Sequence, residues 1–417
     1  MFAVDHESLS KAEFELRLGR FGQAEPFGEA GAEHACYAIC SPDAAFVVAM
    51  AYYIRQGGGS VLLLFGETPQ ETALALATRA QCRGLFYGAD NRYIALNAGN
   101  EPVGKQPSLY QYSSGTTGEP KLIGRTWDEI GIEIAGYNEM IVASGQAEAT
   151  PVILASVTHS FGLITGVFAA IERGVQPVVC VNKNPKAILQ LLRVHPNHLI
   201  YSVPSLLQSL IPLLEHAGVS LNAIISSGAP MSPALYSWLN GKTKLLMQQY
   251  GCTEAGCASL APGMESYDDI GLPLPHMAIP AEAEPAELKF FIDGLGEIAT
   301  GDLGCRSESG RLRFLGRIDD LINVSGLKVM PVEVEGVIGQ LDGVQEVVVF
   351  RGQHPSTGEM VKARVVADET VTAERVRAWC LSQLPPYKAP TDVKIVNHIP
   401  KMPSGKISRK LLEREGI

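Results

Sequence analysis

Hydroxyl side chains, two glycines and a lysine follow one another in the run Tyr112-Ser113-Ser114-Gly115-Thr116-Thr117-Gly118-Glu119-Pro120-Lys121. Glycine lets backbone N–H groups approach an anion closely, and successive N–H groups in such a loop form a concave site for phosphate oxygens. The hydroxyls add hydrogen-bond donors, and Lys121 adds a positive charge. The spacing is not that of a Walker A loop, because Gly118 is followed by Glu119 and not by Lys and then Ser or Thr. The run predicts a nucleotide-phosphate loop of another kind; the alternative is a flexible polar loop.

Regular alternation of strands and helices after residue 150 predicts where ligands bind. Strands are expected at 152–156, 176–181, 198–202, 221–226 and 244–248, and helices at 161–172, 185–194, 204–216 and 233–239. This pattern is typical of βαβ units and a mostly parallel sheet. Ligands of such sheets bind at the carboxyl ends of the strands. Two loops follow such ends, Ser226-Ser227-Gly228-Ala229-Pro230 and Gln249-Tyr250-Gly251-Cys252-Thr253-Glu254.

Less regular patterns precede and follow this region. Before it we expect helices at 8–18, 44–55 and 69–79 and strands at 60–65 and 84–87. Short apolar runs broken by glycine at 288–292, 297–300 and 311–315 predict a small β subdomain. Beyond residue 317, helices at 331–341 and 373–384 and strands at 344–351, 362–367 and 393–396 predict a compact α+β domain. We therefore expect an α/β protein with a large domain, 1–317, joined by a hinge to a small C-terminal domain, 318–417.

Composition limits the class of protein. The 417 residues are enough for two or three domains, and 46% of them are hydrophobic, so a sizeable core is expected. A net charge of -10 argues against nonspecific binding of nucleic acid. The N-terminus lacks the basic and apolar regions of a signal peptide, and the apolar run Ala44–Ile54 is too short to span a bilayer. These features predict a soluble, cytoplasmic protein.

Eight cysteines show no CxxC pair, which favours reduced thiols in the core over a metal site. Cys36 and Cys40 have the spacing of one helix face.

Five motifs, in order between residues 109 and 412, together resemble the adenylate-forming superfamily, which includes acyl- and aryl-CoA synthetases, AMP-dependent ligases and peptide-synthetase adenylation domains. The run 112–121 is similar to its phosphate loop, and 250–254 is similar to its adenine and magnesium motif. The other three are similar to the ribose motif, the hinge and the catalytic-lysine loop: Thr300-Gly301-Asp302-Leu303-Gly304, Gly316-Arg317-Ile318-Asp319-Asp320 and Pro403-Ser404-Gly405-Lys406-Ile407.

The resemblance implies a reaction and residue roles. A carboxylate attacks the α-phosphorus of ATP and pyrophosphate leaves, so the protein positions groups and stabilises charge. Asp302 would accept hydrogen bonds from ribose hydroxyls, and Arg317 would donate to the ribose or the phosphates. Thr253 and Glu254 would be catalytic, with Glu254 as a ligand of Mg²⁺, and Lys406 would bridge the acid and the α-phosphate. The loops 226–230, with Gly228, Ala229 and Pro230, and 249–252 would line the ATP site. The alternatives are a turn residue for Asp302, a helix cap for Glu254 and a solvated charge for Lys406.

The acid is expected to bind near His159, in Thr158-His159-Ser160-Phe161-Gly162-Leu163. This segment aligns with the acyl-pocket motif, in which fatty-acyl and aryl ligases often have a histidine. Relatives that activate amino acids carry an aspartate near this position, and here there is none, so an ammonium would lack a partner. A monocarboxylic fatty or aryl acid without an α-amino group is expected, with His159, Phe161 and Gly162 lining its pocket. A histidine satisfied in the core is the alternative.

The family also implies a second step, in which a thiol takes the acyl group. That acceptor is CoA or the phosphopantetheine of a carrier protein, with Asp319 as the hinge between two conformations and Gly326 beside the pantetheine tunnel. Residues 388–414 hold seven Lys or Arg and two Asp or Glu, a strip that suits an acidic carrier or CoA or is a solvated face. Two departures stand out: Leu122 replaces the glycine that usually follows the motif lysine, and the stretch before the phosphate loop is short, which implies a shortened N-terminal region.

The sequence thus favours an AMP-forming acid–thiol ligase that uses CoA or a carrier protein. The alternatives are a carrier-specific adenylation enzyme of a biosynthetic cluster and a non-catalytic protein that binds adenine nucleotides.

Overall fold

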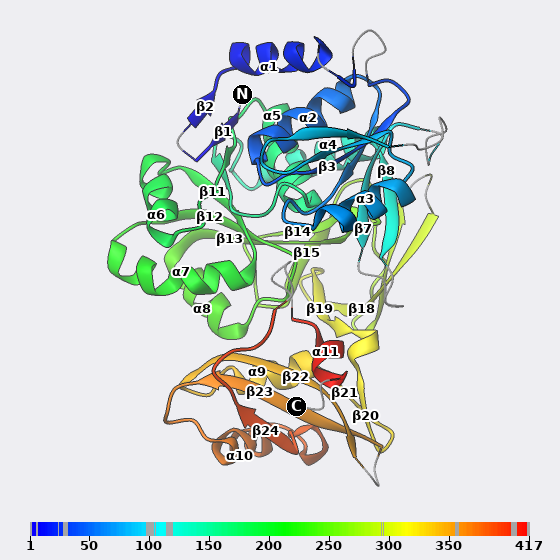
Figure 1. Ribbon diagram of the computed structural model, residues 1–417. Helices are drawn as coiled ribbons and strands as arrows, with labels where there is room; N and C mark the ends of the chain where they lie inside the picture. The colour runs from blue at the N-terminus through cyan, green and yellow to red at the C-terminus, as the bar shows by residue number, and fades with distance from the viewer. Residues whose placement is uncertain are drawn as a thin grey trace.

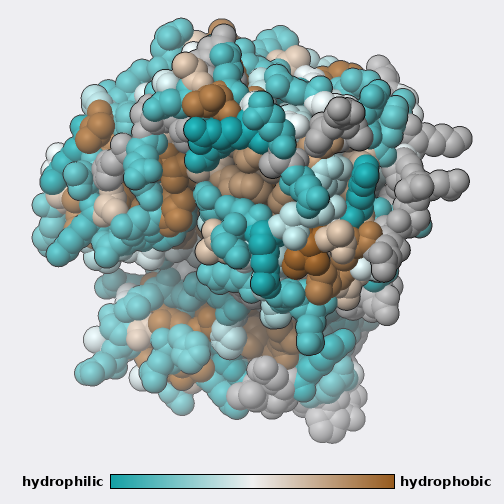
Figure 2. Space-filling view, turned by 45° about the horizontal axis from the view of Figure 1, so that its top comes forward, coloured by the Kyte–Doolittle hydropathy of each residue, from teal (hydrophilic) through white to brown (hydrophobic). Residues whose placement is uncertain are grey.

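A computed structural model describes residues 2–5, 7–23, 25–27, 32–96, 104, 106–113, 120–292, 294, 296–354, 358–401 and 407–414. Figure 1 shows a large part, coloured from blue to yellow-green, above a small C-terminal part coloured from yellow to red. On the face shown in Figure 2, hydrophilic side chains predominate, hydrophobic ones gather in separate patches, and a recess separates the two parts at one side. Within the described ranges, no helix is both long and apolar enough to cross a membrane.

One sheet of the large part has six strands in the order β6-β5-β3-β4-β7-β8. Its strands are β3 (Cys36–Cys40), β4 (Ser60–Leu63), β5 (Gly84–Tyr87), β6 (Arg92–Ala95), β7 (Ser108–Ser113) and β8 (Lys121–Thr126). The four inner strands are parallel, and the edge strands β6 and β8 are antiparallel to their neighbours. The helical spacing expected for Cys36 and Cys40 is wrong, because both lie on β3, where residues four apart also share a face.

A second sheet has thirteen strands in the described chain, in the order β16-β17-β18-β19-β15-β14-β13-β12-β11-β9-β10-β1-β2. Six consecutive strands are parallel: β13 (Thr243–Cys252), β12 (Leu221–Ser226), β11 (His198–Ser202), β9 (Thr150–Ile153), β10 (Val178–Val179) and β1 (Phe2–Val4). The others are antiparallel to their neighbours: β2 (Glu7–Leu9), β14 (Gly256–Pro262), β15 (Asp269–Pro273), β16 (Met277–Ala278), β17 (Ala286–Ile292), β18 (Gly296–Arg306) and β19 (Leu312–Arg317). The hairpins predicted as a β subdomain therefore continue the parallel region as one mixed sheet.

Helices fill the space between the two sheets and cover their outer faces. The helices of the large part are α1 (Lys11–Gln23), α2 (Ala44–Gln56), α3 (Gln70–Arg79), α4 (Trp127–Ala143), α5 (Ala169–Glu172), α6 (Pro185–Val194), α7 (Pro204–Ala217), α8 (Pro233–Lys242) and the π-helix η2 (Phe161–Phe168). The largest buried cluster joins α2, α4 and η2 with one face of each sheet. Other clusters place α3 on the far face of the six-stranded sheet and α6, α7 and α8 on that of the larger sheet. The result is five alternating layers of helix and sheet (Figure 1).

The alternation of residues along β3 shows how a strand serves two of these layers. Tyr37 and Ile39 belong to the cluster between the sheets, whereas Cys36, Ala38 and Cys40 belong to the cluster with α3. All five are buried, because this inner strand has helices on both faces.

The small C-terminal part has its own sheet and its own buried clusters. Its strands are β20 (Ile322–Val324), β21 (Leu327–Val329), β22 (Val344–His354), β23 (Gly358–Ala367) and β24 (Asp392–Ile395). Its helices are α9 (Pro331–Ile338), α10 (Ala373–Gln383), α11 (Arg409–Arg414) and the 3₁₀ turns η3 (Ile318–Asp320) and η4 (Pro386–Lys388). Every member of these clusters lies beyond η3, which is where the sequence predicts the hinge.

Candidate active site

The ends of two neighbouring strands bring two of the predicted motifs to one edge of the large sheet. Strands β12 and β13 are parallel neighbours, and Ser226 pairs with Gln248. Residues 226–230 and 249–254 therefore lie at the same edge of the parallel region. The prediction of a loop at 249–252 is wrong, because these residues continue β13 and pair with β14. Within 226–230, Gly228 has φ +88, which an L side chain rarely adopts, and is exposed together with Pro230, while Ala229 is half-buried.

Tyr250, Asp302 and Arg317 come from three strands and meet in one hydrogen-bonded group. The Tyr250 hydroxyl donates to Oδ2 of Asp302 at 2.7 Å, and Nη1 of Arg317 donates to Oδ1 at 2.9 Å. The same Arg317 nitrogen lies 3.1 Å from the Thr300 carbonyl oxygen. Burial, and then the Asp302 carboxylate, raise the pKa of the Tyr250 hydroxyl well above its usual value, which keeps it a hydrogen-bond donor. The sequence predicted all three residues for the nucleotide site, and the structure brings them together.

Thr253 and Glu254 lie in the tight turn between β13 and β14, and both are half-buried. A side chain at Gly251 would place its Cβ 1.9 Å from the Gly256 carbonyl oxygen, so only glycine allows this close pairing. Burial, and then the Glu254 carboxylate, raise the pKa of Cys252 to about 12, so this thiol stays protonated beside the turn.

Magnesium would suit Glu254 as a single carboxylate ligand. In the part of the chain that the structure describes, no three His, Cys, Asp or Glu side chains gather as a metal site. Mg²⁺ bound to a nucleotide usually takes one or two carboxylates together with phosphate oxygens and water. The residues present fit that mode of binding.

The predicted phosphate loop closes the hairpin of β7 and β8. Ser113 and Lys121 face each other as the last pair of this hairpin. Ser114, Gly115, Thr116, Thr117 and Gly118 lie outside the described residues, as does Lys406.

His159 follows the end of β9 and is exposed, so it is not a histidine enclosed in the core. The next residues begin the π-helix η2, in which the ring of Phe161 lies 5.6 Å from that of Tyr201. A Cβ on Gly162 would lie 2.2 Å from the Ser156 carbonyl oxygen, so glycine lets the helix start directly against the preceding loop. A π-helix is rare and is frequently found at functional sites.

The predicted hinge residue Asp319 is exposed within η3, and its carbonyl oxygen accepts a hydrogen bond of 2.7 Å from Nη2 of Arg351. Gly326 lies in the exposed turn between β20 and β21, where its φ is +90. A Cβ added there would have no atom within 4 Å, so backbone conformation and not crowding favours glycine.

Sequence reasoning missed two charged groups near these motifs, a buried ion pair and a half-buried arginine. Nη2 of Arg125 lies 2.6 Å from Oε2 of Glu133, whose other oxygen accepts from the Cys257 N–H at 2.7 Å. Since Arg125 is on β8 and Cys257 is on β14, this ion pair ties the hairpin of the phosphate loop to the strand that follows Glu254. No short-range signal marks the pair, because its members are eight residues apart and Cys257 follows Glu133 by 124 residues.

Arg409 is the second missed group and supports the predicted hinge. Its Nη1 donates to Asp320 at 2.9 Å, its Nη2 donates to both oxygens of Glu335 at 2.7 and 2.8 Å, and its Nε donates to the Val349 carbonyl at 2.9 Å. Arg409 begins α11, three residues beyond Lys406. It therefore fixes the segment that follows the predicted catalytic loop to the residue after Asp319.

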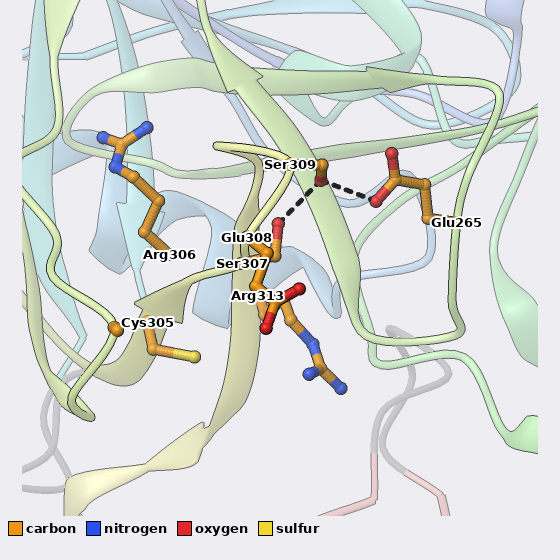
Figure 3. Close-up of a pocket in the computed structure, with 8 residues that line it drawn as sticks. Glu265, Cys305, Arg306, Ser307, Glu308, Ser309 and Arg313 are labelled. Carbon is orange, nitrogen blue, oxygen red and sulfur yellow. Dashed lines mark hydrogen bonds between the residues drawn. The ribbon is translucent and has the colours of Figure 1, made fainter.

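A shallow pocket of about 560 Å³ lies elsewhere, at the turn between β18 and β19 (Figure 3). Three of its polar side chains pair with each other, since Ser309 donates to Glu265 at 2.7 Å and lies 2.9 Å from the Ser307 hydroxyl. Asp302 and Arg317 pair at the opposite end of the same hairpin. None of the residues predicted for the site lines this pocket.

Comparison with known proteins identifies the family of the chain. The family described as AMP-binding enzyme matches residues 47–296, and the AMP-binding enzyme C-terminal domain matches residues 333–406. The chain is 43% identical over 416 residues to the 3,4-dihydroxybenzoate–[aryl-carrier protein] ligase of Bacillus anthracis, covering 99% of this chain and 98% of that protein. It is 28% identical over 333 residues to the 2-succinylbenzoate–CoA ligase of Listeria monocytogenes, covering 73% and 70% of the two chains.

Solved structures resemble the whole chain. ATP-bound MatB from Rhodopseudomonas palustris superposes with a TM-score of 0.84 at 21% identity and covers 99% of this chain and 95% of its own. The o-succinylbenzoate coenzyme A synthetase MenE from Bacillus subtilis, in complex with AMP, gives 0.80 at 20% identity, with 99% and 95% covered. At such identities the likeness concerns the fold, and it confirms the predicted large α/β domain with a small C-terminal domain.

Proposed function

The chain belongs to the AMP-binding enzyme family of adenylate-forming enzymes and is an AMP-forming acid–thiol ligase; from this premise we propose that it activates an aryl acid and passes it to the phosphopantetheine thiol of an aryl-carrier protein. The observation that carries the proposal is the 43% identity, over 99% of the chain, with a 3,4-dihydroxybenzoate–[aryl-carrier protein] ligase. It favours the carrier-specific adenylation enzyme over a ligase that uses CoA. The alternative of a non-catalytic nucleotide-binding protein is wrong for a member of this ligase family.

The surroundings of the predicted acid pocket support an aryl acid. Residues 154–168 contain no Asp or Glu, so an α-ammonium group there would have no carboxylate partner. The rings of Phe161 and Tyr201 are in contact, and an aromatic acid would add a third ring to this pair. His159 lies exposed at the start of this segment, where the acid is proposed to bind.

In the first step, the acid carboxylate attacks the α-phosphorus of ATP, forming the acyl-adenylate and releasing pyrophosphate. Asp302, which is oriented by Tyr250 and Arg317, would accept hydrogen bonds from the ribose hydroxyls. Lys406 would lie between the carboxylate and the α-phosphate and offset the repulsion of two anions. Mg²⁺ on Glu254 would neutralise phosphate charge.

In the second step, the carrier thiolate attacks the acyl carbonyl carbon, the thioester forms and AMP leaves. We propose that residues 318–417 rotate about Asp319 between the two steps, which removes Lys406 and admits the pantetheine past Gly326. Basic residues in 388–414 would meet an acidic carrier; among them Lys394, Lys401, Lys410 and Arg414 are exposed. The cytoplasmic location stays a prediction, supported by eight cysteines that are all free thiols.

ATP–pyrophosphate exchange over a panel of benzoic, hydroxybenzoic, fatty and amino acids tests the first step. We expect exchange with 3,4-dihydroxybenzoate or a closely related aryl acid and none with amino acids. Thioester formation is then compared between CoA and a phosphopantetheinylated aryl-carrier protein. Faster transfer to CoA would overturn the choice of acceptor, and exchange restricted to fatty or amino acids would overturn the choice of acid.

A further inference from the structure

The side chain of Gln111 binds the two residues on either side of His159. Its Nε2 donates to the Thr158 carbonyl oxygen at 2.8 Å, and its Oε1 accepts from the Ser160 hydroxyl at 2.5 Å. Gln111 is only 8% exposed, so water does not readily replace these bonds. One buried amide thus fixes the backbone before His159 and the side chain after it.

These two hydrogen bonds connect the two sheets of the large part. Gln111 is on β7 of the six-stranded sheet, directly before Tyr112, where the predicted phosphate loop begins. Residues 158–160 follow β9 of the thirteen-stranded sheet. A shift of the end of β7 when phosphates bind would therefore reach the segment that holds His159.

The same segment also contacts the second predicted nucleotide motif. Thr165, within η2, places its hydroxyl 2.9 Å from the Phe161 carbonyl oxygen and 3.0 Å from Oε1 of Gln249 on β13, so these two acceptors share its single proton. Thr165 is 1% exposed and Gln249 is 6% exposed. Gln249 directly precedes Tyr250, whose hydroxyl binds Asp302. The segment 158–168 thus contacts one glutamine at its start and a second within η2, and both glutamines lie on strands that lead into predicted nucleotide-binding motifs.

We propose that Gln111 is a positioning residue that couples nucleotide binding to acid binding, so that occupation of the ATP site raises the affinity for the aryl acid. The inference rests on the proposed function, because it takes the acid to bind beside His159. Coupling of this kind is a free energy shared by two sites, and each ligand changes the affinity of the other by the same factor. A chain of contacts alone does not establish it, so the factor itself has to be measured.

Calorimetry on the full chain gives this factor. The dissociation constant of 3,4-dihydroxybenzoate is measured without nucleotide and with saturating Mg²⁺ and α,β-methylene-ATP, an analogue that does not react. In the wild type we expect the analogue to tighten acid binding by about 5- to 150-fold. Gln111→Leu, which keeps the bulk and removes both hydrogen bonds, should reduce the factor to about twofold or less, with affinity for the analogue alone nearly unchanged.

Gln248→Leu is the matched control. Gln248 is also a buried glutamine, 5% exposed. Its Nε2 donates to the Asp269 carbonyl oxygen at 3.0 Å and not to the segment 158–168. The coupling factor should survive this change even if the protein is equally destabilised. Ser160→Ala removes only the hydroxyl that donates to Gln111, so this variant should lower the coupling factor partly. If Gln111→Leu does not fold, the result for Ser160→Ala decides the question.

The outcomes separate the inference from the proposed function. A wild-type factor near one, or an unchanged factor in both Gln111→Leu and Ser160→Ala, would overturn the coupling role. Equal loss in Gln248→Leu would overturn it too, because the effect would then follow from general destabilisation. If the wild type binds no 3,4-dihydroxybenzoate, the proposed acid is wrong, and the same measurement is made with the acid that gives the fastest pyrophosphate exchange.

Discussion

The hydroxyl of Tyr250 donates a hydrogen bond of 2.7 Å to the carboxylate of Asp302, 52 residues further along the chain. Arg317 holds the other carboxylate oxygen at 2.9 Å. Asp302 is therefore oriented by two donors from two different strands.

Tyr250→Phe should raise the KM for ATP about tenfold while kcat changes little. The change removes one hydrogen bond to a charged group, of the order of 1.5–3 kcal/mol, and leaves the ring in place. Pyrophosphate-exchange kinetics at saturating acid measure the effect. Tyr236→Phe is the control, because the Tyr236 hydroxyl donates to the Met264 carbonyl, remote from Asp302 in the chain. An unchanged KM for ATP in Tyr250→Phe would show that the nucleotide does not rely on this carboxylate.

His159→Ala should raise the KM for the acid more than that for ATP, because His159 lies in the segment 158–168, where the acid is proposed to bind, and outside the predicted nucleotide motifs. The two constants are obtained from exchange assays in which each substrate is varied in turn. His216→Ala, an exposed histidine on α7, should change neither. If ATP binding alone weakened in His159→Ala, the assignment of the acid pocket would be incorrect.

Lys406→Ala should nearly abolish pyrophosphate exchange, by a factor on the order of 10²–10³, because the lysine is proposed to stabilise charge that develops in the first transition state. The same variant, supplied with preformed acyl-adenylate and carrier protein, should form thioester at close to the wild-type rate. Circular dichroism checks that the variant is folded.

Lys410→Ala, an exposed lysine of α11, is the control for charge removal in the same region. Normal exchange by Lys406→Ala, or equal failure in both half-reactions, would rule out both the role of Lys406 and the two-conformation mechanism.

Asp319→Pro should preserve the adenylation step and slow thioester formation, because proline fixes φ at the residue about which the C-terminal part is proposed to turn. The two half-reactions are measured separately by exchange and by single-turnover transfer. Asp319→Ala removes the same side chain without fixing φ, and it should affect transfer much less. Equal loss of both half-reactions in the proline variant would count against the hinge.

The free energy of unfolding should fall as the pH drops below about 6.5, in part because of His198. Nε2 of His198 accepts from the Asn222 N–H at 3.0 Å, and Nδ1 lies 2.8 Å from the His195 carbonyl oxygen, so the folded state requires a neutral ring. Burial lowers the pKa of His198 from 6.5. Below that value the unfolded chain binds a proton that the folded chain does not, until the pH reaches the lowered pKa. The slope is at most about 1.4 kcal/mol per pH unit for one histidine.

Urea denaturation of the wild type and of His198→Gln, at pH values from about 7 to about 5.5, measures this slope. Glutamine can still accept from Asn222 but does not titrate, so the variant should show a weaker dependence. Burial also lowers the pKa of His276, so some dependence should remain. An identical slope in both proteins would exclude His198 as a contributor.

Local signals in the sequence were enough for the elements of the βαβ region. Helix α6 begins at Pro185 and ends at Val194 as predicted, because Asn184 caps it and proline suits the first turn. Strands β11 and β12 also match in both bounds. The helix predicted at 8–18 starts too early, because residues 7–9 form strand β2 and the observed helix α1 begins at Lys11. The pairing of β2 with β1 is a tertiary contact that the local sequence pattern does not reveal.

Other features were not predicted from the sequence, most of them because they depend on contacts between distant residues. Helix α4 is the exception, since a local signal for it was present. Helix α4 was missed although Thr126 and Glu129 form a capping box ahead of it. Gln111 was not predicted as a site residue because its partners, Thr158 and Ser160, are 47 and 49 residues away. The roles of Arg125 and Arg409 likewise arise only when distant segments pack together.

The winding of η2 has a consequence for how the acid specificity of such enzymes can change. Removing one residue between Phe161 and Phe168 would let the segment wind as an ordinary α-helix, which turns about 100° per residue. His159 would then rotate relative to Thr165, which is anchored to Gln249. Deleting one residue would therefore change which side chains line the proposed acid pocket, without any substitution. Differences in loop and helix length, which a comparison of pocket residues position by position overlooks, therefore belong among the determinants of substrate choice.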